Sequence, residues 1–168
     1  MHTSEMDLRS LRIVITGATG GIGAELVASF SNCGARVVAA GRDRERLSTL
    51  RATLAGVETM ACNLVTPAGR VEFADSVLAG GGVDMLINNA ATQTPVDALR
   101  PVEWCTLDDE LQLNLHAPIH LTHLFLPSLV MRRPEASSAA VVNITSGLAL
   151  APKASSAPYC ASKAALRS

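Results

Sequence analysis

Residues 16–23 read Thr16-Gly17-Ala18-Thr19-Gly20-Gly21-Ile22-Gly23, and they directly follow the short apolar run at residues 13–15. The glycines allow a tight turn and let the backbone come close to a bound pyrophosphate. If a helix begins at this turn, its free N–H groups and the positive end of its dipole stabilise the phosphate charge. The alternative is a plain strand-to-helix turn, but this glycine content between a strand and a helix favours a dinucleotide-binding loop.

Apolar runs alternate with helix-like segments along the rest of the chain. The runs are rich in β-branched residues and predict buried strands at residues 13–15, 37–39, 57–62, 85–87 and 141–144. The segments between them predict helices at residues 23–31, 43–54, 67–78 and 108–131. This alternation is typical of right-handed βαβ crossovers. We therefore expect an α/β fold: a Rossmann-type doubly wound parallel sheet in three αβα layers, with one domain spanning residues 1–168.

Composition and charge exclude several kinds of partner. The chain has 14 basic and 15 acidic residues among 168, so it has no net field to attract nucleic acid or an anionic membrane. Residues 1–12 are polar, and no apolar stretch reaches the roughly 20 residues that a membrane span needs. The four cysteines form no Cys-x-x-Cys pair, which suits free thiols in a reducing compartment. We expect a cytoplasmic protein that binds neither nucleic acid nor membrane.

Several motifs, in the right order, resemble the short-chain dehydrogenase/reductase (SDR) family. Residues 16–23 match the family's Thr-Gly-x-x-x-Gly-x-Gly, and Asn88-Asn89-Ala90-Ala91 matches its Asn-Asn-Ala-Gly, with Ala91 replacing the last glycine. The residues at the family's catalytic positions are Asn114, Ser146, Tyr159 and Lys163. Residues 114–118 and 146–149 also resemble the DltE-like subgroup. The resemblance implies an NAD(P)-dependent oxidoreductase that moves a hydride between nicotinamide and a small-molecule carbonyl or alcohol substrate.

The end of the second predicted strand bears on the choice of cofactor. NAD-preferring sites usually carry a carboxylate there for the ribose 2′-hydroxyl, whereas an arginine accommodates a 2′-phosphate. Here the strand ends at Gly41-Arg42, so we expect NADP(H) to be favoured, with NAD(H) possible because Asp43 follows at once. Asp43 can instead cap the next helix, and Arg42 can be a solvated surface residue.

The resemblance also implies a set of cofactor-binding residues. Asn63 stands where family members commonly carry Asp against the adenine, and its amide oxygen can still accept from the adenine amine. The expected set is Gly17, Thr19, Gly20, Gly21, Ile22, Gly23, Arg42, Asn63, Asn89, Ala90, Tyr159 and Lys163.

Tyr159 and Lys163 are four residues apart, so on a helix they share one face. A tyrosine with an ordinary pKa of about 10 needs help to act as a base at neutral pH. One charge about 4 Å away, in an effective dielectric of about 20, supplies about 4 kcal/mol, which is enough. The resemblance implies that Lys163 also holds the nicotinamide ribose and that Ser146 hydrogen-bonds the substrate oxygen. A lone Tyr-x-x-x-Lys would indicate a surface helix, but Ser146, Asn114 and the glycine turn together favour a catalytic site.

Asn114 is followed four residues later by Pro118, which has no N–H. The helical hydrogen bond to the Asn114 carbonyl cannot form, so a kink is predicted there. The resemblance implies that this carbonyl holds a water that relays protons between the Tyr–Lys pair and solvent. The alternative is a kinked helix with a solvated carbonyl.

The histidines at 116, 120 and 123 share part of a helix face, but the sequence identifies no carboxylate or thiol partner for them, so no metal site is expected. Trp104 and the loop at residues 92–105 are candidates for the substrate pocket. The resemblance implies that the helix at residues 108–131 and the one starting near Tyr159 are dimer helices, which predicts a homodimer or homotetramer.

Family members continue beyond the equivalent of Ser168 through more helix, two further strands and a segment that covers the nicotinamide. The expected sheet therefore lacks the family's last strands, and the domain is expected to be incomplete at its C-terminus. The alternative to an enzyme is a truncated, non-catalytic NAD(P)-binding or dimerising module.

Overall fold

The computed structural model describes residues 7–96, 103–131 and 139–168. Its five strands form one parallel sheet in the order β3-β2-β1-β4-β5. The strands are β1 Arg12–Thr16, β2 Arg36–Gly41, β3 Val57–Ala61, β4 Met85–Asn88 and β5 Ala140–Asn143. The strand order reverses between β1 and β4, and in open α/β sheets ligands bind beyond the carboxyl ends of the strands at such a switch point.

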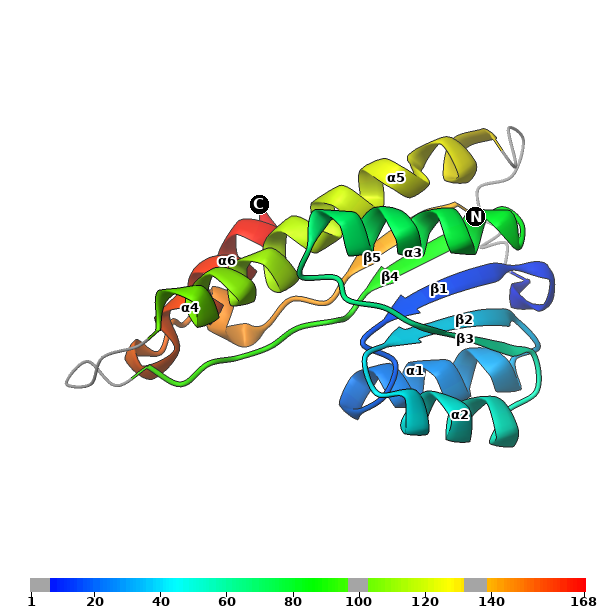
Figure 1. Cartoon of the computed structure of the whole chain (residues 1–168), viewed down its shortest axis with the longest axis horizontal. Helices are drawn as coiled ribbons and strands as arrows, with labels where there is room; N and C mark the ends of the chain where they lie inside the picture. Colours follow the sequence, from blue (N-terminus) through cyan, green and yellow to red (C-terminus); the bar gives the residue numbers. More distant parts are fainter. Residues whose placement is uncertain (1–6, 97–102, 132–138) are drawn as a thin grey trace, which may run out of the picture.

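Helices cover both faces of the sheet (Figure 1). The helices α1 Gly21–Asn32 and α2 Arg44–Thr53 lie on one face, and α3 Pro67–Ala79 and α5 Ala117–Met131 lie on the other. The remaining helices are α4 Trp104–Leu111 and α6 Ala157–Arg167. The short helical turns are η1 Leu8–Ser10, η2 Gln112–His116, η3 Gly147–Ala149 and η4 Ala154–Ser156. The three αβα layers expected from the sequence are confirmed. In the described segments, no helix is both long and apolar enough to cross a membrane.

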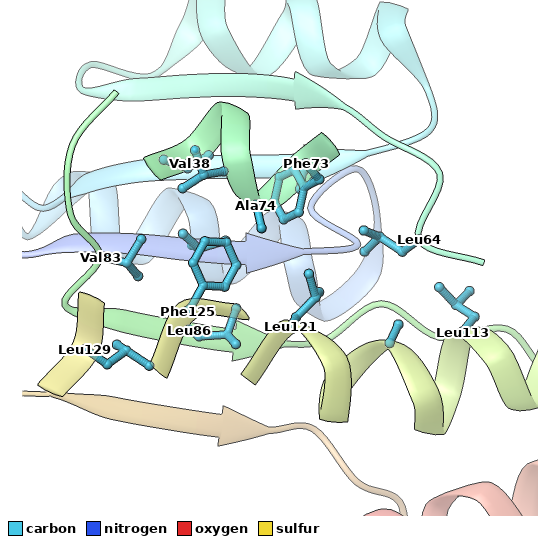
Figure 2. Close-up of a cluster of buried hydrophobic side chains, with 14 residues drawn as sticks. Val38, Leu64, Phe73, Ala74, Val83, Leu86, Leu113, Leu121, Phe125 and Leu129 are labelled. Atoms are coloured by element: carbon cyan, nitrogen blue, oxygen red, sulfur yellow. The ribbon is translucent and has the colours of Figure 1, made fainter. Parts of the chain in front are cut away.

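The apolar runs form strands because both sheet faces are covered, so every residue of β1 is buried. Figure 2 shows the core on the α3 and α5 side, where Phe73 and Phe125 pack edge to face with ring centroids 6.2 Å apart. The core on the α1 and α2 side is aliphatic and includes Ile13, Ile15, Val27, Val37 and Leu47.

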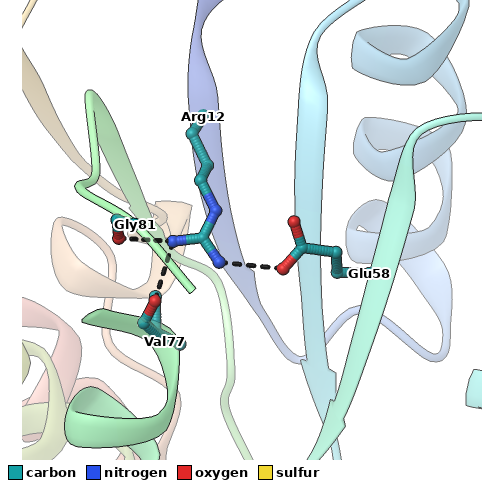
Figure 3. Close-up of polar contacts among 4 residues, drawn as sticks. All are labelled: Arg12, Glu58, Val77 and Gly81. Carbon is teal, nitrogen blue, oxygen red and sulfur yellow. Dashed lines mark hydrogen bonds and ion pairs between the residues drawn. The ribbon is translucent and has the colours of Figure 1, made fainter. Parts of the chain in front are cut away.

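A buried arginine holds the amino ends of the strands together (Figure 3). The Nη1 atom of Arg12 donates to the carbonyls of Val77 and Gly81 at 2.8 and 2.6 Å. Its Nη2 atom pairs with Glu58 on β3 at 2.8 Å. The cation therefore satisfies carbonyls at the C-terminal end of α3, which favours positive charge. This network stands at the end of the sheet opposite the carboxyl ends.

The helix predicted at residues 108–131 begins earlier and is divided. The chain is already helical at Trp104, and Gln112–His116 form a single π turn in which the Ala117 N–H bonds the Gln112 carbonyl. The sequence predicted a kink near Asn114, and the structure has this π turn there. Pro118 consequently lies in the first turn of α5, where a missing N–H costs little.

Candidate functional site

The glycine turn between β1 and α1 is held in a shape that requires glycine. Gly17 and Gly21 have φ values of 65° and 50°, in the left-handed region that favours glycine. A Cβ atom at Gly17 would lie 2.7 Å from the Ala90 Cα atom, and one at Gly23 would collide with the Gly17 carbonyl oxygen. The loop therefore packs against itself and against the segment that follows β4.

Asn89 braces this loop from the end of β4. Its Nδ2 atom donates to the carbonyls of Thr16 and Gly17 at 2.9 and 3.1 Å. The Thr16 hydroxyl oxygen in turn accepts from the backbone N–H groups of Asn89 and Ala90, each at 3.0 Å. Asn89 thus acts on the glycine loop through its side chain, and Thr16 is a supporting residue that the sequence analysis missed.

A pocket of about 320 Å³ opens beside the glycine loop, at the carboxyl ends of β1, β2 and β3. Its lining residues are Gly17, Thr19, Gly20, Gly41, Arg42, Asp43, Arg46, Cys62, Asn63, Leu64, Val65, Ala90, Ala91 and Leu113. Six members of the predicted cofactor set line it: Gly17, Thr19, Gly20, Arg42, Asn63 and Ala90. The other six members of the set do not line this pocket: Gly21, Ile22, Gly23, Asn89, Tyr159 and Lys163.

The charged residues of the pocket lie at the start of α2. Asp43 caps this helix by accepting from the Arg46 N–H at 3.0 Å, and its other carboxylate oxygen pairs with Arg46 Nε at 3.3 Å. The capping role that the sequence left open for Asp43 is therefore confirmed. Arg42 is exposed at the pocket, as is Arg46, which the sequence analysis did not single out.

The residues that follow β3 form a neutral part of the pocket wall, and two of them, Cys62 and Asn63, carry polar groups. The Oδ1 atom of Asn63 accepts from the Val65 N–H at 3.1 Å, which fixes the side chain in a local turn. Burial raises the pKa of the Cys62 thiol to about 11, so this group is neutral at physiological pH and belongs to the apolar part of the wall.

Helix α6, which contains Tyr159 and Lys163, lies at the same end of the sheet as the glycine loop, beyond the carboxyl ends of the strands (Figure 1). The Lys163 side chain is buried, and its Nζ atom lies 5.8 Å from the centroid of the Tyr159 ring. Nζ donates to the Ile144 carbonyl, just after β5, at 2.8 Å. Burial lowers the pKa of Lys163 because the charged form loses its hydration.

Ser146 precedes η3 and faces its own turn. Its hydroxyl oxygen accepts from the Leu148 N–H at 3.2 Å. Within the described segments, no hydrogen bond joins the hydroxyls of Ser146 and Tyr159. The Ser146 proton can therefore be donated to another acceptor.

Asn114 fastens the loop after β4 to α6. Its buried side chain accepts from the Thr92 N–H at 2.9 Å and donates to the Thr92 carbonyl at 2.8 Å and to the Ser162 hydroxyl at 3.2 Å. One helical turn earlier, the fully buried Glu110 accepts from the Thr94 N–H at 2.7 Å. Sequence reasoning considered only the main-chain carbonyl of Asn114, because nothing in the sequence shows where the loop lies.

Two other predictions concern this region. Trp104, a candidate for the substrate pocket, has 82% of its surface exposed, and residues 97–102 of the same loop lie outside the described residues. Among the residues whose placement is described, no cluster of three or more His, Cys, Asp or Glu could hold a metal ion.

An open parallel sheet with a glycine-rich first turn, and a pocket at the carboxyl ends beside it, is the architecture of a Rossmann-type domain. The family model for short chain dehydrogenases matches residues 12–168, and the chain belongs to this family.

Similar proteins span the same region. The uncharacterized oxidoreductase DltE of Bacillus subtilis is 37% identical over 97% of this chain and 64% of its own length. L-xylulose reductase of Mesocricetus auratus is 32% identical over 96% of this chain and 64% of its own length. The crystal structure of a metagenomic short-chain oxidoreductase in complex with NADP superposes with a TM-score of 0.85 at 31% identity, covering 96% of this chain and 73% of that one. The chain thus spans less than two thirds of the length of these two curated relatives.

Proposed function

We propose that this protein is an NAD(P)-dependent oxidoreductase that transfers a hydride between nicotinamide and the carbon of a carbonyl or alcohol in a small-molecule substrate. The observation that carries the proposal is the buried Lys163 beside Tyr159, on the side of the sheet where the glycine loop and its pocket open. We also propose one cytoplasmic domain over residues 1–168 that forms homodimers or homotetramers.

The pocket residues fit a dinucleotide. The absence of a side chain at Gly17 and Gly23 lets the loop pack closely on itself and on the segment after β4. The first turn of α1 has free N–H groups for a pyrophosphate. Arg42 lies where a 2′-phosphate would need a cation, whereas the carboxylate of Asp43 is already engaged as a helix cap. These contacts favour NADP(H) over NAD(H), and the NADP complex of the similar metagenomic enzyme supports the same choice.

The catalytic roles follow from the chemistry of the four residues. The nicotinamide of the bound cofactor supplies or accepts the hydride. The Tyr159 hydroxyl exchanges a proton with the substrate oxygen, and the positive charge of Lys163 stabilises the phenolate. Ser146 already accepts from its own turn, so its proton is available to the substrate oxygen. The Asn114 side chain links the loop after β4 to α6. Its main-chain carbonyl is the proposed start of the proton relay.

The central test is Tyr159→Phe in the full-length protein. The substitution removes only the proton-transferring hydroxyl, so NADPH-dependent reduction of a ketone panel should fall at least a hundredfold while the Kd of NADPH changes less than about threefold. Retained turnover in the Phe variant would refute the proton-transfer role.

The alternative is a non-catalytic NAD(P)-binding or dimerising module, for which the glycine loop and its pocket would be sufficient. The same assay separates the two functions. NADPH binding without turnover in the unmodified complete protein would favour the module.

A further inference from the structure

We propose that Arg46 is a second specificity residue for the cofactor: its guanidinium and that of Arg42 together bind the 2′-phosphate of the adenosine ribose. This inference rests on the proposed NADP(H) preference. It adds a residue that the position at the end of β2 does not indicate.

Arg46 reaches the pocket from the first turn of α2. Its Nη1 atom donates to the Thr19 carbonyl in the glycine loop at 3.3 Å, so the side chain crosses from the helix to the loop. A Cβ atom at Gly20 would lie 3.6 Å from the same Nη1 atom, which places the guanidinium directly against the side-chain-free part of the loop. Arg46 therefore lines the pocket wall next to the glycine loop.

The local charges suit a dianionic group. The pocket lining contains the cations Arg42 and Arg46 and the anion Asp43. The Arg46–Asp43 pair is exposed, with 68% and 46% of the two side chains accessible, so solvent screens it and it holds Arg46 only weakly. A phosphate has more charge and more acceptor oxygens than this carboxylate and matches the fork of a guanidinium. Arg46 can thus bind a phosphate without giving up a strong partner.

The neighbouring arginines of α2 do not share this placement. Arg44 lines an adjoining hollow, together with Arg42 and Asp109, that contains no residue of the glycine loop, and Arg51 lies on the last turn of the helix. Neither lines the pocket that contains the glycine loop. Arg51 is therefore a matched control, since it carries the same charge on the same exposed helix.

The test measures affinities for adenosine 2′,5′-bisphosphate and 5′-AMP, which differ only in the 2′-phosphate, by calorimetry at low salt. NADPH and NADH are measured beside them. Arg46→Gln should weaken the bisphosphate and NADPH by about tenfold, because one charge-assisted contact in partly exposed surroundings is lost. Binding of 5′-AMP and NADH should change less than about twofold. Arg46→Lys should restore part of the loss, and Arg51→Gln should have no effect.

The outcomes separate this inference from the proposed function. Equal affinities of NADPH and NADH in the unmodified protein would overturn the NADP(H) preference and this inference together. A preference that Arg42→Ala reduces and Arg46→Gln leaves unchanged would overturn only the role of Arg46. A uniform loss for all four ligands in Arg46→Gln would also overturn it, because Arg46 would then act through the shape of the glycine loop.

Discussion

A single methyl group is enough to disturb the glycine loop at Gly23. In Gly23→Ala the new Cβ atom would collide with the Gly17 carbonyl oxygen and lie 2.6 Å from Asn89 Nδ2. The loop and its brace would both have to move, so we expect a loss of about 1–3 kcal/mol in the free energy of unfolding, as in other overpacked sites. NADPH affinity should fall roughly tenfold or more, because the N–H groups of the loop are displaced from the pyrophosphate.

Urea unfolding and NADPH titration measure the two effects of Gly23→Ala. Gly147→Ala is the control, since a Cβ atom there meets nothing within 4 Å. Unchanged stability and affinity in Gly23→Ala would show that the loop is less tightly packed than its contacts indicate.

Lys163 gives a pH dependence whose sign follows from its burial. Its pKa is lowered in the folded protein from an ordinary value of 10.5, so the unfolded chain binds more protons in the window between the folded value and 10.5. The contribution of this group to stability therefore rises with pH through that window. We expect the free energy of unfolding of the unmodified protein, minus that of Lys163→Met, to increase between pH 7 and pH 10.5. A difference that stays flat or falls in urea titrations would contradict the burial effect.

At the scale of elements, Arg70 of α3 connects the cofactor pocket to the π turn. Its buried guanidinium donates to the carbonyls of Leu64 and Val65 at 2.7 and 2.6 Å, and to the carbonyl and side-chain oxygens of Gln112 at 3.1 and 2.7 Å. Leu64 and Val65 line the pocket, and Gln112 begins the turn that contains Asn114. Arg70 thereby connects the pocket wall to the turn that contains Asn114.

Arg70→Met should remove this connection while keeping an unbranched stem as long as that of arginine up to Nε. The carbonyls left without a donor cost about 1–3 kcal/mol each where they stay buried, so we expect thermal unfolding at a clearly lower temperature. NADPH should also bind more weakly. Arg51→Met is the exposed control, and equal melting temperatures for the two variants would show that Arg70 is dispensable.

The same elements show how far sequence reasoning reaches. The five strands were predictable within about two residues, because apolar runs between helical segments have few other places to be buried. The π turn was predictable only as a break, since a missing N–H at Pro118 does not fix which hydrogen bonds replace the lost one. Arg12 and Arg70 were not predictable, because a buried arginine is indistinguishable in sequence from a solvated one.

For the site, half of the predicted cofactor set lines the pocket because the glycine loop and the strand ends have fixed places in the fold. Arg46 was missed because its position depends on the orientation of α2 relative to the glycine loop, and sequence spacing does not give this orientation. The side-chain partners of Asn114 were missed for the same reason, since Thr92 and Ser162 come from other elements.

At the scale of the whole molecule, one exposed face of α5 carries large apolar side chains, with the exposed His123 between two of them. Ile119, Leu126 and Val130 follow helical spacing along it and have 60%, 48% and 64% of their surface accessible. A row of this kind is typical of a subunit interface, and the family resemblance implies dimer helices in the same region.

We therefore expect the protein to sediment as a homodimer or homotetramer at micromolar concentration. Leu126→Glu should shift it toward monomer, because the new charge would be buried at a two-fold contact and meet its own copy. Val71→Glu is the matched control, since Val71 is an exposed apolar residue on the neighbouring helix α3. Dissociation by Leu126→Glu and not by Val71→Glu would assign the interface to α5. A monodisperse monomer for the unmodified protein would refute the association, whereas an oligomer that survives Leu126→Glu would move the interface to another surface.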